Sequence, residues 1–333
     1  MAKSAMLPKI NLVISNLLDA NKGLKAVIKK ELADHLSGKR FIILSSLIVV
    51  TCLAALYVAA STIRTSVGQN ELDFVFLKLF TTSGSSLPFS FISFVSFLGP
   101  LVGLTMGFDA INGERDRGTL SRILSQPIYR DAFINGKFIS GVIVLTIAIF
   151  GLGFLVAGLG LLFFGIPPSL SEVLRIITYL ITSIIYISFW LSLSILFSLL
   201  FRQSSTSALA GIAVWLFLAI FAGLLAGMVA DGIYPVTDSS DVDRILANSR
   251  LKQNLSRLSP STLYDEATTT LLNPTIRTLG PVLLQQTFGA IKGPLSFGQS
   301  LLLIWPQLIG LIAATLICFA ISYIIFMRQE IRA

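Results

Sequence analysis

Long, uninterrupted runs of apolar residues dominate the hydrophobic pattern of this chain. A helix needs roughly 20 apolar residues to cross the hydrocarbon layer of a bilayer. A backbone in lipid must satisfy its own hydrogen bonds, which leaves helices and closed barrels as spanning structures. Barrel strands alternate apolar and polar residues, so runs that are apolar throughout favour helices. The pattern therefore predicts an all-α integral membrane protein with six transmembrane helices, at residues 41–61, 86–108, 138–164, 176–201, 208–230 and 300–327.

Three segments outside these runs show helical periodicity. Residues 22–40 place apolar side chains on one face and lysines elsewhere, which predicts a helix lying in the plane of the lipid headgroups on the cytoplasmic side. Residues 72–80 predict a short amphipathic helix before the second span. The segment 231–299 contains two helical stretches, near 241–258 and 260–273. Without tandem repeats in the sequence, a single domain over residues 1–333 is the simplest division.

The composition agrees with a bilayer environment and excludes a soluble globule. Hydrophobic residues make up 54% of the chain and charged residues 13%, against about 25% charged in ordinary domains. The net charge of +8 is compatible with nucleic acid, but 16 of the 25 Lys and Arg residues gather on one side of the predicted spans. Such residues mark the cytoplasmic side and bind anionic headgroups. We therefore expect membrane lipid as a partner, no nucleic acid, and both termini in the cytoplasm.

The sequence offers no pattern of a catalytic or metal site. The Gly-Lys pairs at 38–39 and 136–137 lack the rest of a phosphate-binding loop, so we expect no ATP hydrolysis by this chain. His35 is the single histidine, which leaves neither a histidine cluster for a metal nor a base for a serine nucleophile. The span cores carry no ionisable residue, which disfavours proton- or ion-coupled transport. We expect no catalytic residue, metal or cofactor on this chain.

Small residues recur at helical spacing in the second and fifth predicted spans. Such a seam lets another helix approach closely. Ordinary helix packing and the lining of a transport route both account for it, and the sequence leaves both open. The seam residues are Ser90, Ser93, Gly99, Gly103 and Gly107 in the second span, and Gly223 and Gly227 in the fifth.

The connection after the second span, residues 109–137, is longer and more charged than a turn between helices needs. Residues 112–113 predict a turn, and residues 119–125 predict a short helix whose apolar edge is Leu120, Ile123 and Leu124. A solvated charged loop is the alternative to a folded docking element.

This connection also carries a family resemblance. It reads D-x-I-x-x-E-R-x-x-G-T-L at 109–120, L-S-Q-P-x-x-R at 124–130 and G-K at 136–137. With KELADHLSGKRF at 30–41 and SPSTLYDEATTTLLNP at 259–274, the chain closely resembles the ABC type-2 permease family, in its NosY-like branch, over essentially its whole length. The resemblance implies the permease subunit of an ATP-driven exporter in the cytoplasmic membrane of a prokaryote.

The resemblance also implies partners and roles. Two cytosolic ABC ATPase subunits would bind ATP and Mg²⁺, and a second permease copy or a paralogue, joined at the small-residue seams, would complete the assembly. Residues 22–40 would form a connecting helix, and the outer segment 231–299 would cap the exit or contact an external partner. The alternative function is a membrane scaffold that supports maturation of an extracytoplasmic enzyme. The ATPase-coupling residues would be Glu114, Arg115, Arg117, Gly118, Thr119, Leu120, Ile123 and Leu124.

Overall fold

The computed structural model describes residues 6–66, 74–84, 89–126, 128–165, 167–235, 242–279 and 293–329, with side chains described except at 6–21, 40, 64–66 and 124. Within these residues the regular structure is entirely helical, which confirms the all-α prediction. The helices are α1 (Met6–Ser37), α2 (Lys39–Ser66), α3 (Val75–Thr81), α4 (Phe91–Gly107), α5 (Asn112–Asp116), α6 (Thr119–Leu124), α7 (Arg130–Phe164), α8 (Leu170–Leu200), α9 (Ser204–Leu216), the π-helical turn η1 (Phe217–Phe221), α10 (Ala222–Ile233), α11 (Val242–Ser256), α12 (Pro260–Leu272) and α14 (Phe297–Arg328).

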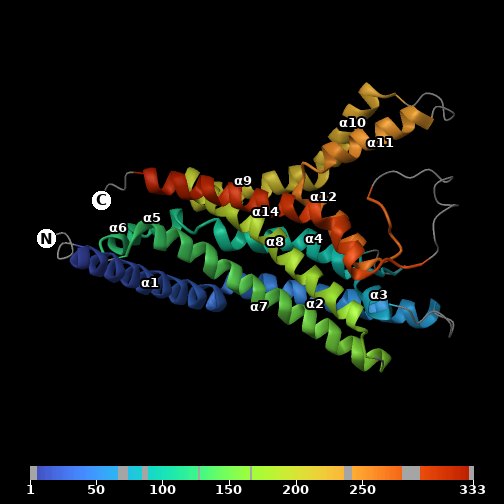
Figure 1. The fold of residues 1–333 in the computed structure, drawn as a ribbon, viewed down its shortest axis with the longest axis horizontal. Helices are drawn as coiled ribbons and strands as arrows, with labels where there is room; N and C mark the ends of the chain where they lie inside the picture. The colour runs from blue at the N-terminus through green and yellow to red at the C-terminus, as the bar shows by residue number, and fades with distance from the viewer. Residues whose placement is uncertain are drawn as a thin grey trace.

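Six stretches of the described chain are long and apolar enough to cross a membrane, as predicted. Figure 1 shows that α2, α4, α7, α8, α9 and α14 run lengthwise through the molecule, whereas α10 projects from it, and that the start of α1 and the end of α14 lie at the end where α5 and α6 lie. An even number of crossings requires this arrangement of the termini. The six stretches are Phe41–Ile63, Phe91–Asp116, Arg130–Phe164, Leu170–Leu200, Ser204–Ile233 and Phe297–Arg328.

Several helices extend beyond the apolar runs that predicted them. The helix α7 begins at Arg130 rather than near residue 138, and α8 begins at Leu170 rather than near residue 176. At α8, Ser169 and Glu172 form a capping box, in which each side chain binds the other residue's backbone N–H. Apolarity marks only the part of a helix suited to lipid, whereas caps and polar contacts set its ends.

The helix α1 is longer than the predicted surface helix and runs along α7. It begins at Met6 and ends at Ser37, so the predicted range 22–40 includes the break at Gly38 and the start of α2. The two helices approach closely at Gly136, where an added Cβ would lie 2.6 Å from Cγ1 of Val27. Lack of a side chain at Gly136 therefore allows this contact.

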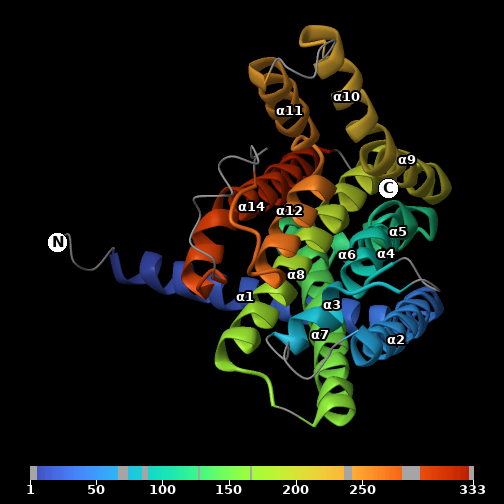
Figure 2. The ribbon, with the colours of Figure 1, turned by 90° about the vertical axis from the view of Figure 1, so that its right-hand side faces the viewer.

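The helix α8 forms the centre of the bundle. It packs against α4, α7, α12 and α14 (Figure 2), and the side chains of Tyr179, Tyr186 and Trp190 on it are fully buried. Aromatic side chains of this size bury large apolar areas, so α8 supplies much of the contact that orders the neighbouring helices.

The two helices predicted within 231–299 are present as α11 and α12, in different surroundings. The helices α10 and α11 pair and project away from the bundle (Figure 1), whereas α12 packs against α8, α14 and α4. The short helix predicted before the second span is α3, whose residues Val75, Phe76, Leu79 and Phe80 are buried. Residues 72–73 of that prediction lie outside the described residues.

Candidate functional site

The connection after α4 folds into two short helices, α5 and α6, joined at Gly118. Gly118 has φ +65°, and no atom lies within 4 Å of the position a Cβ would occupy. This left-handed backbone is costly for residues with a Cβ, which explains the glycine. The start of α5 is fixed to α8, because Ser198 Oγ accepts from the N–H groups of Ile111 and Asn112 at 2.8 and 3.1 Å.

Glu114 of α5 points back into the protein, where it joins two other helices. Its Oε1 lies 2.8 Å from Nζ of Lys30 on α1 and 3.8 Å from Nζ of Lys137 on α7. Thr119 at the start of α6 donates from its hydroxyl to the carboxylate and to the main-chain oxygen of Glu114. Only 6% of the Glu114 side chain is exposed, so α5 is fixed through buried charge.

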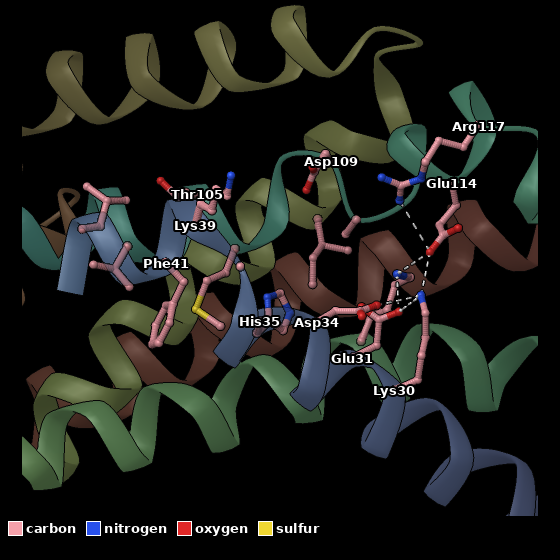
Figure 3. A pocket seen from close by; sticks show the side chains of 17 residues that line it. Lys30, Glu31, Asp34, His35, Lys39, Phe41, Thr105, Asp109, Glu114 and Arg117 are labelled. Carbon is pink, nitrogen blue, oxygen red and sulfur yellow. Dashed lines mark hydrogen bonds and ion pairs between the residues drawn. The ribbon is translucent and has the colours of Figure 1, made fainter. Parts of the chain in front are cut away.

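Glu31 of α1 completes what we call the ionic cluster, formed by Lys30, Glu31, Glu114 and Lys137. Its Oε1 accepts from Lys137 Nζ at 2.8 Å and from Lys30 Nζ at 3.0 Å. Figure 3 shows the labelled members of the cluster meeting from different helices. The two carboxylates balance the two ammonium groups, and buried charges are tolerated when they are paired in this way.

The pKa shifts in α1 agree with a charged cluster. Burial alone would raise the pKa of Glu31, but the charges and hydrogen bonds of Lys137 and Lys30 outweigh it and lower that pKa. Burial would lower the pKa of Lys30, but Glu114 and Glu31 raise it above its usual range. The pKa of His35 is lowered, chiefly by burial. At neutral pH both Lys30 and Glu31 are therefore charged, while His35 is neutral.

The ionic cluster forms one wall of a cavity of about 610 Å³ (Figure 3). Other walls come from the start of α2 and from the end of α4, including Phe41, Val102 and Thr105. Among the described residues, no group of three His, Cys, Asp or Glu side chains is arranged to hold a metal. The ionic cluster links α1, α5 and α7, so a displacement of one of these helices would displace the others.

The side chain of Leu120, part of the predicted apolar edge, is turned into the protein. Its side chain is 3% exposed and packs in a cluster with Val27 of α1, Phe133 of α7 and Phe326 of α14. Ile123 is partly buried against the same cluster, and the side chain of Leu124 lies outside the described residues. The chain's own helices thus cover Leu120 and part of Ile123, because burial removes these apolar side chains from water.

The exposed surface of this element is polar and is here called the α5–α6 surface. It comprises Asp116, Arg117, Gly118, Ser121 and Arg122, all of which are exposed. Arg115 is partly exposed, and Thr119 is turned toward Glu114. Of the predicted coupling residues whose side chains are described, the fully exposed ones are Arg117 and Gly118.

The glycines of the predicted seam on α4 pack against α8 of the same chain. A Cβ on Gly103 would lie 2.6 Å from the main-chain oxygen of Ile187, and one on Gly107 would lie 2.9 Å from that of Leu191. A Cβ on Gly99 would lie 3.0 Å from the side chain of Ile187. Ordinary helix packing accounts for this part of the seam, and the expected contact of Gly103 with a second copy is wrong because α8 fills that space.

The remaining seam residues have other surroundings. Ser90 caps α4, with its hydroxyl accepting from the N–H of Ser93 and lying 3.0 Å from the Ser93 hydroxyl. The Cβ position of Gly223 has no atom within 4 Å, and that of Gly227 meets only the side chain of Lys252, at 3.7 Å. The glycines of the fifth span therefore leave room for a helix from outside this chain.

Lys30, Glu31 and Lys137 were not selected from the sequence as site residues. All three occur within the strings that carry the resemblance, at 30–41 and 136–137. Two features of the sequence could have pointed to them: the adjacent Lys30 and Glu31 in the predicted surface helix, and Lys137 directly before the apolar run 138–164. Their pairing depends on how α1 folds back along α7, which the sequence pattern does not specify.

This chain matches one family profile and two curated proteins of the same name. The profile of a family described as "ABC-2 family transporter protein" matches residues 25–331. A "Probable ABC transporter permease protein NosY" of Stutzerimonas stutzeri is 28% identical over 123 residues, which cover 37% of this chain and 40% of that protein. The protein of the same name from Pseudomonas aeruginosa is 29% identical over 122 residues, again 37% and 40%. The chain thus matches less than half the length of these curated relatives.

Proposed function

The chain belongs to the ABC-2 family of transporters, and we propose that it is the membrane-spanning permease subunit of an exporter driven by separate ABC ATPase subunits. ATP and Mg²⁺ would bind to the ATPase chains, and this chain would receive their motion through a protein contact. The end of the molecule that carries α5, α6 and both termini would face the cytoplasm, and cargo would move outward. The distribution of Lys and Arg supports this orientation.

The observation that carries the proposal is the position of Glu114. It joins α5 to Lys30 of α1 and to Lys137 of α7 within one buried cluster. A displacement of α5 would therefore move the surface helix and the third span together, because separating paired buried charges costs several kcal/mol. This link would convert ATPase motion at the membrane surface into movement of a spanning helix.

The ATPase contact would use the α5–α6 surface. Its exposed residues Asp116, Arg117 and Arg122 are charged. The contact would therefore rely on residues of opposite charge on the ATPase. Leu120 of the predicted apolar edge would instead hold α6 against the chain's own helices.

A second permease copy or a paralogue would pack against the fifth span. The stretch Ser204–Ile233 is the least buried of the six described spans. Most of its exposed residues are apolar, apart from Ser205, Thr206 and Asp231 near its ends, and Gly223 has no neighbour within 4 Å of its Cβ position. A face of this kind suits either lipid or a closely packed helix.

Charge reversal at the α5–α6 surface tests the ATPase contact. Arg122→Glu should lower both co-purification of a co-expressed ABC ATPase and its stimulation by the permease, each by about tenfold. Arg250→Glu, at an exposed position in α11, is the matched control and should leave both unchanged. Wild-type values for Arg122→Glu and for Asp116→Arg would contradict docking at this surface.

A further inference from the structure

A second cavity, of about 540 Å³, lies beside the starting half of α4 and away from the ionic cluster. It is bounded by α4, by α9 with η1, and by α12. Hydroxyl groups of Ser90, Ser93, Ser96 and Ser261 line it together with the aromatic rings of Phe89, Phe97 and Trp215. Asp265 of α12 is the single charged residue of the lining.

Asp265 faces the cavity without a cation of its own among the described residues. Its Oδ1 accepts from the hydroxyl of Ser96 on α4 at 2.7 Å, and its side chain is exposed. The ion pairs found between described residues involve other acids, namely Glu31, Asp34, Glu114 and Glu266. The cavity therefore carries a negative charge that nothing described in the chain neutralises.

The position of Asp265 is fixed by the packing of α12. The rings of Tyr264 and Tyr186 stack with their centroids 4.3 Å apart, and the Tyr186 hydroxyl donates to the main-chain oxygen of Ser96 at 3.0 Å. At the start of α12, Ser259 donates to the main-chain oxygen of Leu218 in η1 at 3.0 Å. π-Helical turns often occur at functional sites. α8 and η1 thus hold α12 in place, and Ser96 of α4 binds the carboxylate itself.

The Asp265 side of this cavity is poorly suited to contact with lipid chains. Ser96 lies about 8 Å along α4 from Phe91, at 1.5 Å per residue, and so within a membrane-spanning stretch. A charged carboxylate exposed to hydrocarbon at that depth would be strongly unfavourable. Water or a cationic ligand in the cavity would stabilise the charge.

We propose that this cavity binds an organic cation with an apolar body, such as a quaternary ammonium or phosphonium ion. Asp265 would pair with the positive charge, and the hydroxyls of Ser93 and Ser96 would solvate it. Phe97 and Trp215, whose rings meet edge to face at 5.0 Å, would contact the apolar body. Binding requires neither the ATPase nor transport. That the bound cation is cargo near its exit is a separate step, which rests on the proposed function.

Binding of radiolabelled tetraphenylphosphonium to the purified chain in nanodiscs tests the proposal. Triphenylphosphine oxide serves as a neutral comparator of similar apolar surface. We expect the phosphonium to bind the wild-type chain, and Asp265→Asn to weaken that binding about tenfold or more, since hydrogen-bonded and charged contacts are worth this much. Asp265→Glu should retain most of the affinity.

The controls separate the site from general effects. Asp243→Asn removes an exposed acid in α11 and should leave phosphonium binding unchanged. In the Asp265→Asn variant the side-chain amide oxygen can still accept from Ser96, so the fold should persist, which thermal unfolding of the variant checks. Equal binding by wild type and Asp265→Asn, or equal binding of the neutral comparator and the cation, would overturn the proposal. Because no ATPase is present, either result leaves the proposed coupling function untouched.

Discussion

The ammonium group of Lys137 on α7 lies 2.8 Å from the carboxylate of Glu31 on α1, and the two side chains are 4% and 8% exposed. Removing one partner of such a buried pair is strongly destabilising, because the other charge stays buried without a partner. The pair therefore ties the surface helix to the third span more firmly than any exposed ion pair would.

Lys137→Met should destabilise the protein by about 3 kcal/mol, whereas the double variant Lys137→Met/Glu31→Met should recover most of that loss. The exposed Lys39→Met is the control, with an expected change of less than about 0.5 kcal/mol. Chemical unfolding in mixed micelles measures all of these. A double variant as unstable as the single one would show that the charges are not the source of the effect.

Gly103→Ala should destabilise the packing of α4 on α8 by about 2 kcal/mol. The new Cβ would meet main-chain atoms of Ile187 and Leu191 at 2.6 and 3.0 Å, and main-chain atoms cannot rotate away. Gly151→Ala, in α7, is the matched control, because its Cβ position has no atom within 4 Å. Thermal unfolding in detergent compares them, and equal melting temperatures would argue against this helix contact.

Gly118→Ala should strain the junction of α5 and α6 by roughly 1–2 kcal/mol, because alanine disfavours φ +65°. Gly118→Asn should cost less, since asparagine tolerates left-handed backbone better. Hydrogen–deuterium exchange over residues 112–126 would report faster exchange for alanine than for asparagine. The opposite order would mean that the junction adopts another conformation.

The stability of the wild-type protein should fall as the pH drops below about 6.5, partly through His35. Its pKa in the folded chain is lowered from 6.5, mainly by burial, so the folded state binds fewer protons than the unfolded state. Stability then rises with pH between the lowered folded pKa and 6.5 and is constant above this window. His35→Gln should flatten that part of the profile of melting temperature against pH. An unchanged slope would assign the effect to other groups.

The hydrophobic pattern predicted the fold class and the number of spans, because length and apolarity are local properties. Helix ends were predicted less well. The start of α7 at Arg130 and the length of α1 depend on contacts between the two helices, such as Gly136 against Val27. The family resemblance is confirmed over most of the chain.

The candidate site was only partly predictable. The string at 109–120 identified Glu114, but its partners lie 84 and 23 residues away, at Lys30 and Lys137, and such pairing is set by tertiary structure. Leu120 followed the expected helical periodicity, yet periodicity does not tell whether an apolar edge is covered by the same chain or by a partner. The coupling role of these residues stays a prediction.

Arg175 near the start of α8 shows how the order of synthesis affects this fold. Its guanidinium is fully buried and donates to the main-chain oxygens of Leu271 and Leu295, at 2.7 and 2.6 Å, and to the hydroxyl of Ser300 at 2.9 Å. All three acceptors leave the ribosome long after α8, and a buried cation without acceptors is costly. A nascent chain must therefore keep Arg175 in water until the last span arrives, so a product truncated before Leu295 should be a ready substrate for membrane quality-control proteases.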